Sequence, residues 1–338
     1  MQTRSTPSIA FQSSPVRSSV GVLAIIVLLG APGLAAGASD QPIDSGQSTA
    51  TNRRLELEEV DMNLIDPALL GFGPPGFSVV VTVSKAMDFS QENGSVDYTD
   101  GRALLPVWAH ETEDGTVFGA TLAYGWASLD ASGALGLPRQ NLNTLELQLT
   151  AAHFPKGDEG WMGLAIVSPG LATDFKNVSS DDFSFSAIVV AGYQFSPRFT
   201  LSAAAFYAHS IGEDTVVPGI GVVWRPNEQW IVQLTPPIGA VGWSPNKNWI
   251  FSLSAYPSGG AWGIDQAGKD RNIEAIQLEG WRAGLGMERR VGDHLRLSAQ
   301  VGMNFGGQLE LRDRNGGVLF NRDLDSSPFG LLGAAWNF

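Results

Sequence analysis

The chain has 338 residues, 43% of them hydrophobic and only 16% charged, with a formal net charge of −13. Nucleic acid is a poor partner for such an acidic chain, because Lys and Arg drive binding to phosphates. The absence of cysteine excludes disulfides, thiolate nucleophiles and thiolate metal sites. Its 40 glycines and few charges favour strands joined by turns over helices.

Residues 1–38 have the three parts of a secretory signal peptide. A basic lead with two arginines is followed by the apolar run 20–29 and by small residues that end at Ala38. The run is too short to cross a membrane comfortably. A signal anchor is the alternative, but Pro32 and the Ala/Gly cluster favour cleavage near Ala38. Cleavage leaves 34 acidic residues against 19 of the 21 basic ones, a formal charge of −15.

The polar segment 39–75 leads into a Gly- and Pro-rich stretch, 71–76, whose spacing matches G-x-G-x-x-G. A phosphate site of that type needs free backbone N–H groups at the start of a helix. Two prolines lie inside this stretch and a strand follows it, so we interpret it as a turn. We expect 39–75 to be a periplasmic lead-in, either disordered or a small plug, to a domain that spans 76–338.

From Phe77 onward, apolar and polar residues alternate with the period of two that is typical of β-strands. The longest alternation, 295–305, matches the about nine to eleven tilted residues that a membrane strand needs. No segment after the signal peptide reaches about 18 uninterrupted apolar residues. If the mature chain crosses a membrane, it must therefore do so as a closed barrel. A soluble β-sandwich is the alternative, but its strands are usually shorter.

We predict an all-β fold, a single closed antiparallel transmembrane β-barrel of about 14 strands. A barrel of about 12 strands is the alternative, because Pro236-Pro237 could be a kink in one long strand and 308–322 an extended hairpin. The predicted strands are 77–89, 101–112, 116–128, 143–154, 160–172, 182–195, 198–210, 216–225, 229–236, 238–244, 248–256, 274–290, 294–312 and 327–338.

The connections alternate between short and long, as they do in barrels with short periplasmic turns and longer outer loops. With the C-terminus placed in the periplasm, the periplasmic turns are short and built from Pro, Gly, Asn and Asp. They are 113–115, 155–160, 196–198, 226–229, 245–248 and 291–294. Most of the predicted outer loops are longer, notably 129–142, 171–181, 257–273 and 313–326.

Aromatic residues flank the same short turns. Indole and phenyl rings favour the boundary between lipid headgroups and hydrocarbon. A ring of them at one end of the strands therefore predicts a girdle at the membrane interface. Its predicted members are Phe195, Phe199, Trp224, Trp230, Trp243, Trp249, Trp336 and Phe338.

The last strand, 327–338, ends on Phe338 with Trp336 two residues before it. It resembles the closing strand of Gram-negative outer-membrane β-barrels, whose terminal aromatics are recognised by the barrel assembly machinery. The resemblance covers about 77–338 and points to a poorly characterised family of unknown function, without a motif specific to porins or fatty-acid transporters. It implies the assembly machinery, membrane lipid and lipopolysaccharide as partners, and location in the outer membrane. The oligomeric state stays open.

The predicted inward face carries charges of both signs among small residues. Such charges pair across the lumen or set a field that selects small solutes. Since about 14 strands leave more interior than side chains need fill, we expect a water-filled path or a small plug. The expected function is a passive channel or transporter for small solutes or apolar ligands; the alternative is a structural or adhesive barrel whose outer loops bind a partner. Possible lumen-lining residues are Glu146, Gln148, Arg282, Glu288, Arg296, Gln300 and Asn304.

The sequence offers little that indicates catalysis. The four histidines are scattered, without metal-ligand spacing. His209 and Ser210 lie at the predicted outer rim, with Glu213 and Asp214 following, and these residue types could form a hydrolase site. Ordinary loop polarity is the simpler interpretation. We predict no enzyme activity, no catalytic residue, no cofactor and no bound metal.

Overall fold

A computed structural model describes residues 76–133, 137–176, 178–210, 213–265, 273–313 and 316–337. The predicted signal peptide 1–38, the lead-in 39–75 and Phe338 lie outside them. Within the described ranges no helix is long and apolar enough to cross a membrane, and the one helical segment is the 3-10 turn η1 (Ser180–Asp182). The strands are β1 (Gly76–Ser84), β2 (Met87–Asp88), β3 (Ser95–Glu111), β4 (Thr116–Ala131), β5 (Leu137–His153), β6 (Gly160–Thr173), β7 (Phe183–Ser196), β8 (Phe199–Ser210), β9 (Glu213–Asn227), β10 (Trp230–Thr235), β11 (Ile238–Asn246), β12 (Trp249–Gly263), β13 (Ala275–Val291), β14 (Leu295–Arg312), β15 (Val318–Leu324) and β16 (Ser327–Asn337).

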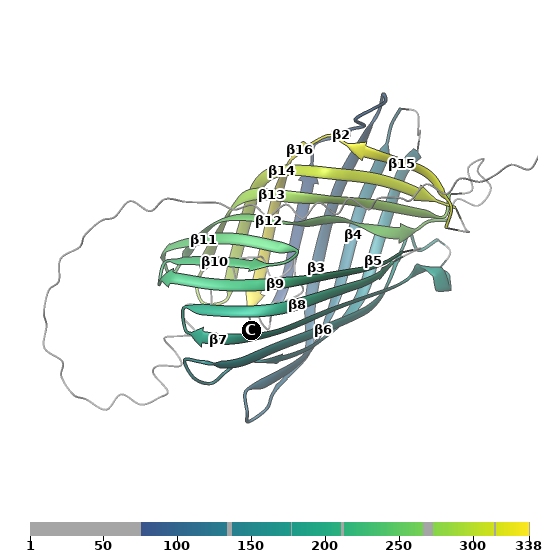
Figure 1. Cartoon of the computed structure of the whole chain (residues 1–338). Helices are drawn as coiled ribbons and strands as arrows, with labels where there is room; N and C mark the ends of the chain where they lie inside the picture. Colours follow the sequence, from purple (N-terminus) through teal and green to yellow (C-terminus); the bar gives the residue numbers. More distant parts are fainter. Residues whose placement is uncertain are drawn as a thin grey trace, which may run out of the picture. The chain divides into compact units, whose positions relative to one another are not determined.

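The strands form one sheet that closes on itself (Figure 1). The first strand, β1, pairs antiparallel with the last, β16, along one edge and with β3 along the other. Two short segments, β2 and β15, extend the rim beside β3 and β14, so fourteen strands make the ring. The predicted closed antiparallel barrel of this strand count is confirmed. The 12-strand alternative is wrong, because Pro236 and Pro237 form the turn between β10 and β11.

Side chains alternate between the two faces of the wall as the sequence predicted. On β1, Phe77, Val81 and Val83 are exposed on the outside. Between them, Ser78 and Thr82 are buried inside the barrel. A closed ring gives every wall strand a paired neighbour on both sides over at least part of its length, and an apolar exterior suits hydrocarbon. The chain therefore has the architecture of an outer-membrane β-barrel.

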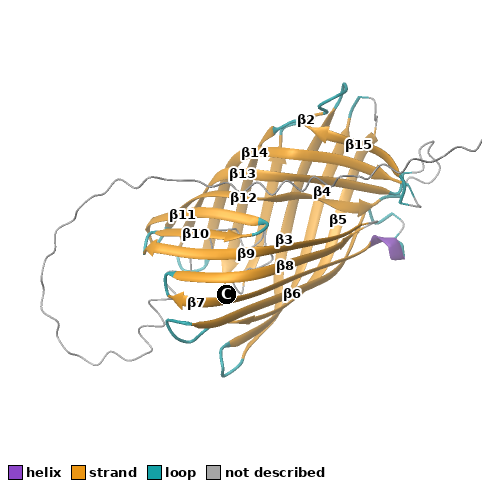
Figure 2. Cartoon of the chain, viewed as in Figure 1, coloured by secondary structure: helices purple, strands orange, loops and turns teal. Residues whose placement is uncertain are grey.

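The predicted short turns lie at one end of the strands (Figure 2). At the opposite end, the strands extend into segments that were predicted to be long loops. Much of the predicted loop 129–142 belongs to the wall, because β4 continues to Ala131 and β5 begins at Leu137. Likewise, β12 continues to Gly263 and β15 occupies part of 313–326. The strands extend because their inward side chains pack into an apolar core at this outer end, described below.

A β-bulge at Gly306 reverses the alternation along β14. Opposite Gly280 of β13, β14 has two residues, and Gly306 adopts a φ of 59°. Glycine tolerates this left-handed conformation, and the extra residue of a bulge moves the following side chains to the other face. Leu309 and Leu311 consequently point inward and are fully buried. Simple continuation of the alternation from 295–305 would have placed both on the outside.

Candidate functional site: the barrel interior

The outer end of the interior holds a large apolar core instead of the expected water-filled path. Its buried side chains come from strands on one half of the ring. Among them, Leu129, Ile276 and Leu309 are completely inaccessible to solvent. The remaining buried members include Met87, Phe89, Val96, Tyr98, Leu137, Leu142, Trp262, Ile264, Ile273, Leu278, Leu311 and Leu324. This core closes one half of the outer lumen.

Direct contacts between opposite walls separate that half from the other. Gly263, at the end of β12, pairs in parallel with Thr173 at the end of β6, and the Asp174 backbone N–H donates to the Gly263 carbonyl at 3.0 Å. On the same strand, Trp262 donates its indole N–H to the Thr144 hydroxyl of β5 at 3.2 Å, and β5 lies opposite β12 in the ring. The outer lumen is therefore divided into a filled compartment and a second compartment bounded by β6–β9.

Asp174 holds this cross-lumen contact. Its carboxylate is almost completely buried and accepts a 2.9 Å hydrogen bond from the Lys176 ammonium group. It also accepts from the backbone N–H groups of Lys176, at 3.1 Å, and Asp265, at 3.3 Å. A buried carboxylate is stable only with such partners. The set fixes the outer end of β6 to the segment that follows β12.

Below the apolar core, Arg282 of β13 organises a polar layer. Its guanidinium forms a bidentate ion pair with Asp100 of β3. It also donates to Asn304 of β14 at 3.1 Å and to the Thr82 hydroxyl of β1 at 3.4 Å. The ring of Phe329 on β16 lies 5.5 Å from the guanidinium carbon, within cation–π range. The layer thus connects β13 to β3 across the strands that close the barrel.

The other predicted lumen-lining residues also lie in paired arrangements on the inner wall. Gln300 accepts from the Tyr256 hydroxyl at 2.7 Å and donates to Ser254 at 2.9 Å. Glu146 pairs with Arg102. Glu288 and Arg296 form an ion pair at 3.9 Å. Asn304 donates to the hydroxyls of Ser84 and Ser327 at 3.1 Å each, and Gln148 is buried. The structure therefore distributes these residues over several pairs instead of gathering them into one site.

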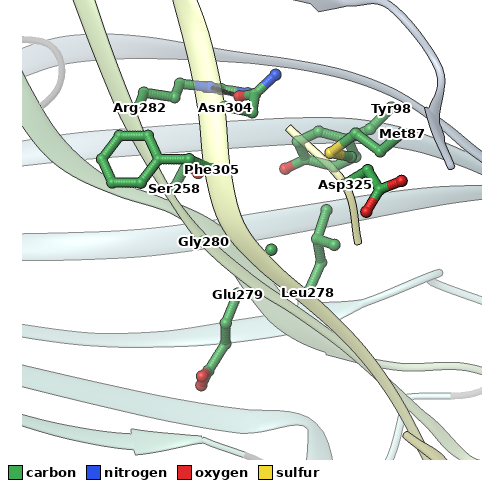
Figure 3. Close-up of a pocket in the computed structure, with 11 residues that line it drawn as sticks. Met87, Tyr98, Ser258, Leu278, Glu279, Gly280, Arg282, Asn304, Phe305 and Asp325 are labelled. Atoms are coloured by element: carbon green, nitrogen blue, oxygen red, sulfur yellow. Dashed lines mark hydrogen bonds between the residues drawn. The ribbon is translucent and has the colours of Figure 1, made fainter. Parts of the chain in front are cut away.

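A small cavity lies where the polar layer meets the apolar core (Figure 3). Its lining includes Met87, Tyr98, Leu278, Arg282 and Asn304. The volume is about 20 Å³, which is room for about one water molecule. This cavity is thus too small to hold a solute larger than water.

In the other half of the wall, charged residues occur only in β9, whose sequence has Glu213, Asp214 and Arg225 near its two ends. The strands β7, β8, β10, β11 and β12 contain no Asp, Glu, Lys or Arg. Small or apolar side chains face inward here, such as Ser186, Ser202, Ala204, Phe206 and Val217, and all of them are half-buried. None of the predicted lumen-lining residues belongs to this surface. Its signal in the sequence is the lack of charge across consecutive strands.

The predicted aromatic girdle lies on the outer face, beside the short turns. Neighbouring rings contact one another, as in the Trp230–Trp243 pair at 6.3 Å and the Trp249–Phe251 stack at 6.0 Å. Trp108 joins the exposed aromatics because a bulge in β3 follows Pro106. Of the predicted members, Phe195, Phe199, Trp224, Trp230, Trp243 and Trp336 are exposed, Trp249 is half-buried, and Phe338 lies outside the described residues.

At the outer rim, His209 and Asp214 are cross-strand partners on the exterior. The His209 Nδ1 atom lies 2.6 Å from Asp214 Oδ1, which also accepts from the Tyr207 hydroxyl at 3.2 Å. The side chains of Ser210 and Glu213 lie outside the described residues. In the described part of the chain no cluster of three or more His, Asp or Glu residues could hold a metal ion.

A family model described as "Domain of unknown function (DUF6268)" matches residues 86–337. No curated protein matches the chain. The Pseudomonas putida toluene transporter TodX is 11% identical, with 81% of this chain and 93% of that one covered and a TM-score of 0.39. The NanC porin is 9% identical, with 78% of this chain and 100% of that one covered and a TM-score of 0.36. The transport unit of the Escherichia coli autotransporter AIDA-I is 11% identical, with 86% of this chain and 97% of that one covered and a TM-score of 0.41. At TM-scores this low the likenesses carry no information on function.

Proposed function

This chain belongs to the DUF6268 family, and from its geometry we propose that it is a passive channel or transporter for small solutes in the outer membrane of a Gram-negative bacterium. The proposal rests on the contrast between the two halves of the interior. One half is filled by apolar side chains and paired charges. The inner face of the other carries mainly uncharged side chains that stay partly accessible.

The chemistry of the accessible half favours uncharged, apolar solutes. An ion that leaves water needs charged or strongly polar groups to replace its hydration shell. The strands β7, β8 and β10–β12 offer hydroxyls, methyl groups and the Phe206 ring, but no formal charge. A neutral apolar molecule that leaves water for such a surface loses little hydration free energy and gains apolar contacts.

The proposed location follows from the exterior of the barrel and from the sequence. Exposed apolar residues cover the strands, and exposed aromatics lie beside the short turns. Cleavage near Ala38 would release the chain into the periplasm. We further propose that the assembly machinery recognises the C-terminal strand, and that lipid and lipopolysaccharide surround the assembled barrel.

The test is conductance and solute permeability of the refolded protein in planar bilayers and liposomes. An Ala204→Trp substitution introduces an indole on the inner face of β8, and we expect it to lower permeability for neutral solutes. The matched control, Ala203→Trp, introduces the same group on the outer face of the same strand. Equal effects of the two variants, or wild-type protein that passes neither ions nor neutral solutes, would contradict the proposal.

A further inference from the structure

The hairpin β10–β11 is too short to complete the wall. β10 has only six residues, Trp230–Thr235, from the girdle residue Trp230 to the turn at Pro236-Pro237. With a rise of about 3.4 Å per residue and a tilt of about 40°, they cover about 15 Å of an apolar band about 25 Å tall. The tip of the hairpin therefore lies within the hydrocarbon region.

The two flanking strands continue past this tip (Figure 1). Val222 is the first residue of β9 that pairs with β10. The preceding residues of β9, from Glu213 onward, pair only with β8. Pairing of β12 with β11 ends at Ala255, although β12 continues to Gly263 alongside β13. Within the described residues, the edges 213–221 and 257–262 therefore have no strand between them.

The geometry also keeps these edges apart. Two missing strands leave three strand spacings, about 14 Å, between the backbones of β9 and β12. The end of β12 contacts β6 through the Gly263–Thr173 pairing across the lumen. This contact prevents β12 from leaning against β9 to close the wall. The tip itself packs on β9, because a Cβ added at Gly219 would lie 2.8 Å from Pro236.

Prolines occupy the margins of the gap. Irregular backbone is unfavourable in hydrocarbon because its N–H groups lack partners. Proline has no N–H, and within sheets it is confined to edges and irregular positions. The tip consists of Pro236 and Pro237, while Pro218 lies on the edge of β9 and Pro257 on the edge of β12. The margins thus present few donors to lipid, and no Asp, Glu, Lys or Arg occurs in 215–224 or 249–263.

We propose that the space between residues 215–218 of β9 and 257–262 of β12 is a lateral opening, through which a neutral apolar molecule passes between the uncharged compartment and the hydrocarbon of the outer leaflet. This inference rests on the proposed transport function and adds its route and its class of solute. Water-soluble compounds would not use the opening, since it leads into hydrocarbon.

The test closes the opening with a covalent bridge. Because the chain has no cysteine, Val216→Cys on β9 and Ala261→Cys on β12, both on the outer face of the wall, can be joined by a bismaleimide without other reaction. The control pair, Ala203→Cys and Ile220→Cys, joins two strands that are already register partners. Both proteins are inserted in the outer membrane of a Gram-negative host, and uptake of the neutral fluorophore N-phenyl-1-naphthylamine is measured. Single-channel conductance is measured on the same purified proteins.

Bridging Val216→Cys to Ala261→Cys should lower fluorophore uptake at least about fivefold, because only the route through hydrocarbon is blocked, while conductance stays near wild type. The control bridge should change neither. Unchanged uptake after complete bridging, verified by mass spectrometry, overturns the lateral opening but leaves the proposed function intact. The opening is also refuted if bridging abolishes conductance as well, or if wild-type protein conducts ions without raising uptake. Wild-type protein that does neither contradicts the proposed function itself.

Discussion

Arg282 and Asp100 form a bidentate ion pair inside the barrel, on strands β13 and β3 that flank the closing strands β14, β16 and β1. The Arg282 side chain is only 4% exposed, so water contributes little to its stabilisation. The pair therefore links β13 to β3 on the inner side of the strands that close the barrel. We assign it a structural role, distinct from that of the uncharged surface proposed to carry solute.

Replacing Arg282 with Ala should destabilise the barrel by about 3 kcal/mol, the low end for a broken buried pair because Asp100 keeps some access to water. The midpoint of heat-modifiable gel migration, or urea unfolding in micelles, measures the loss. The double variant Arg282→Met with Asp100→Leu should recover much of it, since no charge is then left unpaired. A double variant less stable than either single one would argue against this account.

The bulge at Gly306 needs a residue that tolerates a positive φ. A Gly306→Ala substitution should cost about 1 kcal/mol, because L-residues are strained in the left-handed region. The matched control is Gly330→Ala, where φ is ordinary and an added Cβ meets no atom within 4 Å. Unfolding in detergent micelles compares the two. If both variants unfold like wild type, backbone strain at Gly306 does not control the reversal on β14.

His209 and Asp214 provide a direct test of the hydrolase alternative. We expect His209→Ala to assemble and conduct like wild type, because the pair lies on the exterior of the rim. Hydrolysis of a short-chain ester by purified wild-type protein should stay at background. Ester hydrolysis that His209→Ala removes from an otherwise intact barrel would establish an enzyme and contradict our prediction.

The turn between β3 and β4 should respond to acid only at low pH. Hydrogen bonds from the Thr112 and Thr116 hydroxyls, followed by the Thr116 backbone N–H, lower the pKa of Asp114. A depressed carboxyl pKa adds stability above the unfolded value of about 3.9, and that stability is lost as the pH falls through the folded pKa. The NMR titration of the Asp114 carboxyl should therefore have its midpoint below about 3.9. Thr112→Ala should raise the midpoint, and an unshifted titration in wild type would refute the assignment.

The strand pattern was accessible from the sequence because it is local. Alternation with a period of two depends only on which side chains face lipid, as on β1 from Phe77 to Val83. The short turns and the doublet Pro236-Pro237 are equally local, and they placed fourteen strands whose ends at the short turns are close to those observed. At the opposite end, β3, β5 and β12 extend six or seven residues beyond the predicted strands. Each predicted lumen residue fell on a strand, but its partner stayed unknown, since Arg282 and Asp100 are 182 positions apart.

By itself, the sequence determined that the chain alternates, turns back repeatedly and closes as a barrel. Only the tertiary structure decided how the interior is used. The bulge at Gly306 turns Leu309 and Leu311 inward, and the contact between Thr173 and Gly263 divides the outer lumen. Both depend on where distant strands meet across the barrel. A period of two predicts which face of the sheet each residue occupies, but it does not predict which residues of the opposite wall that side chain contacts.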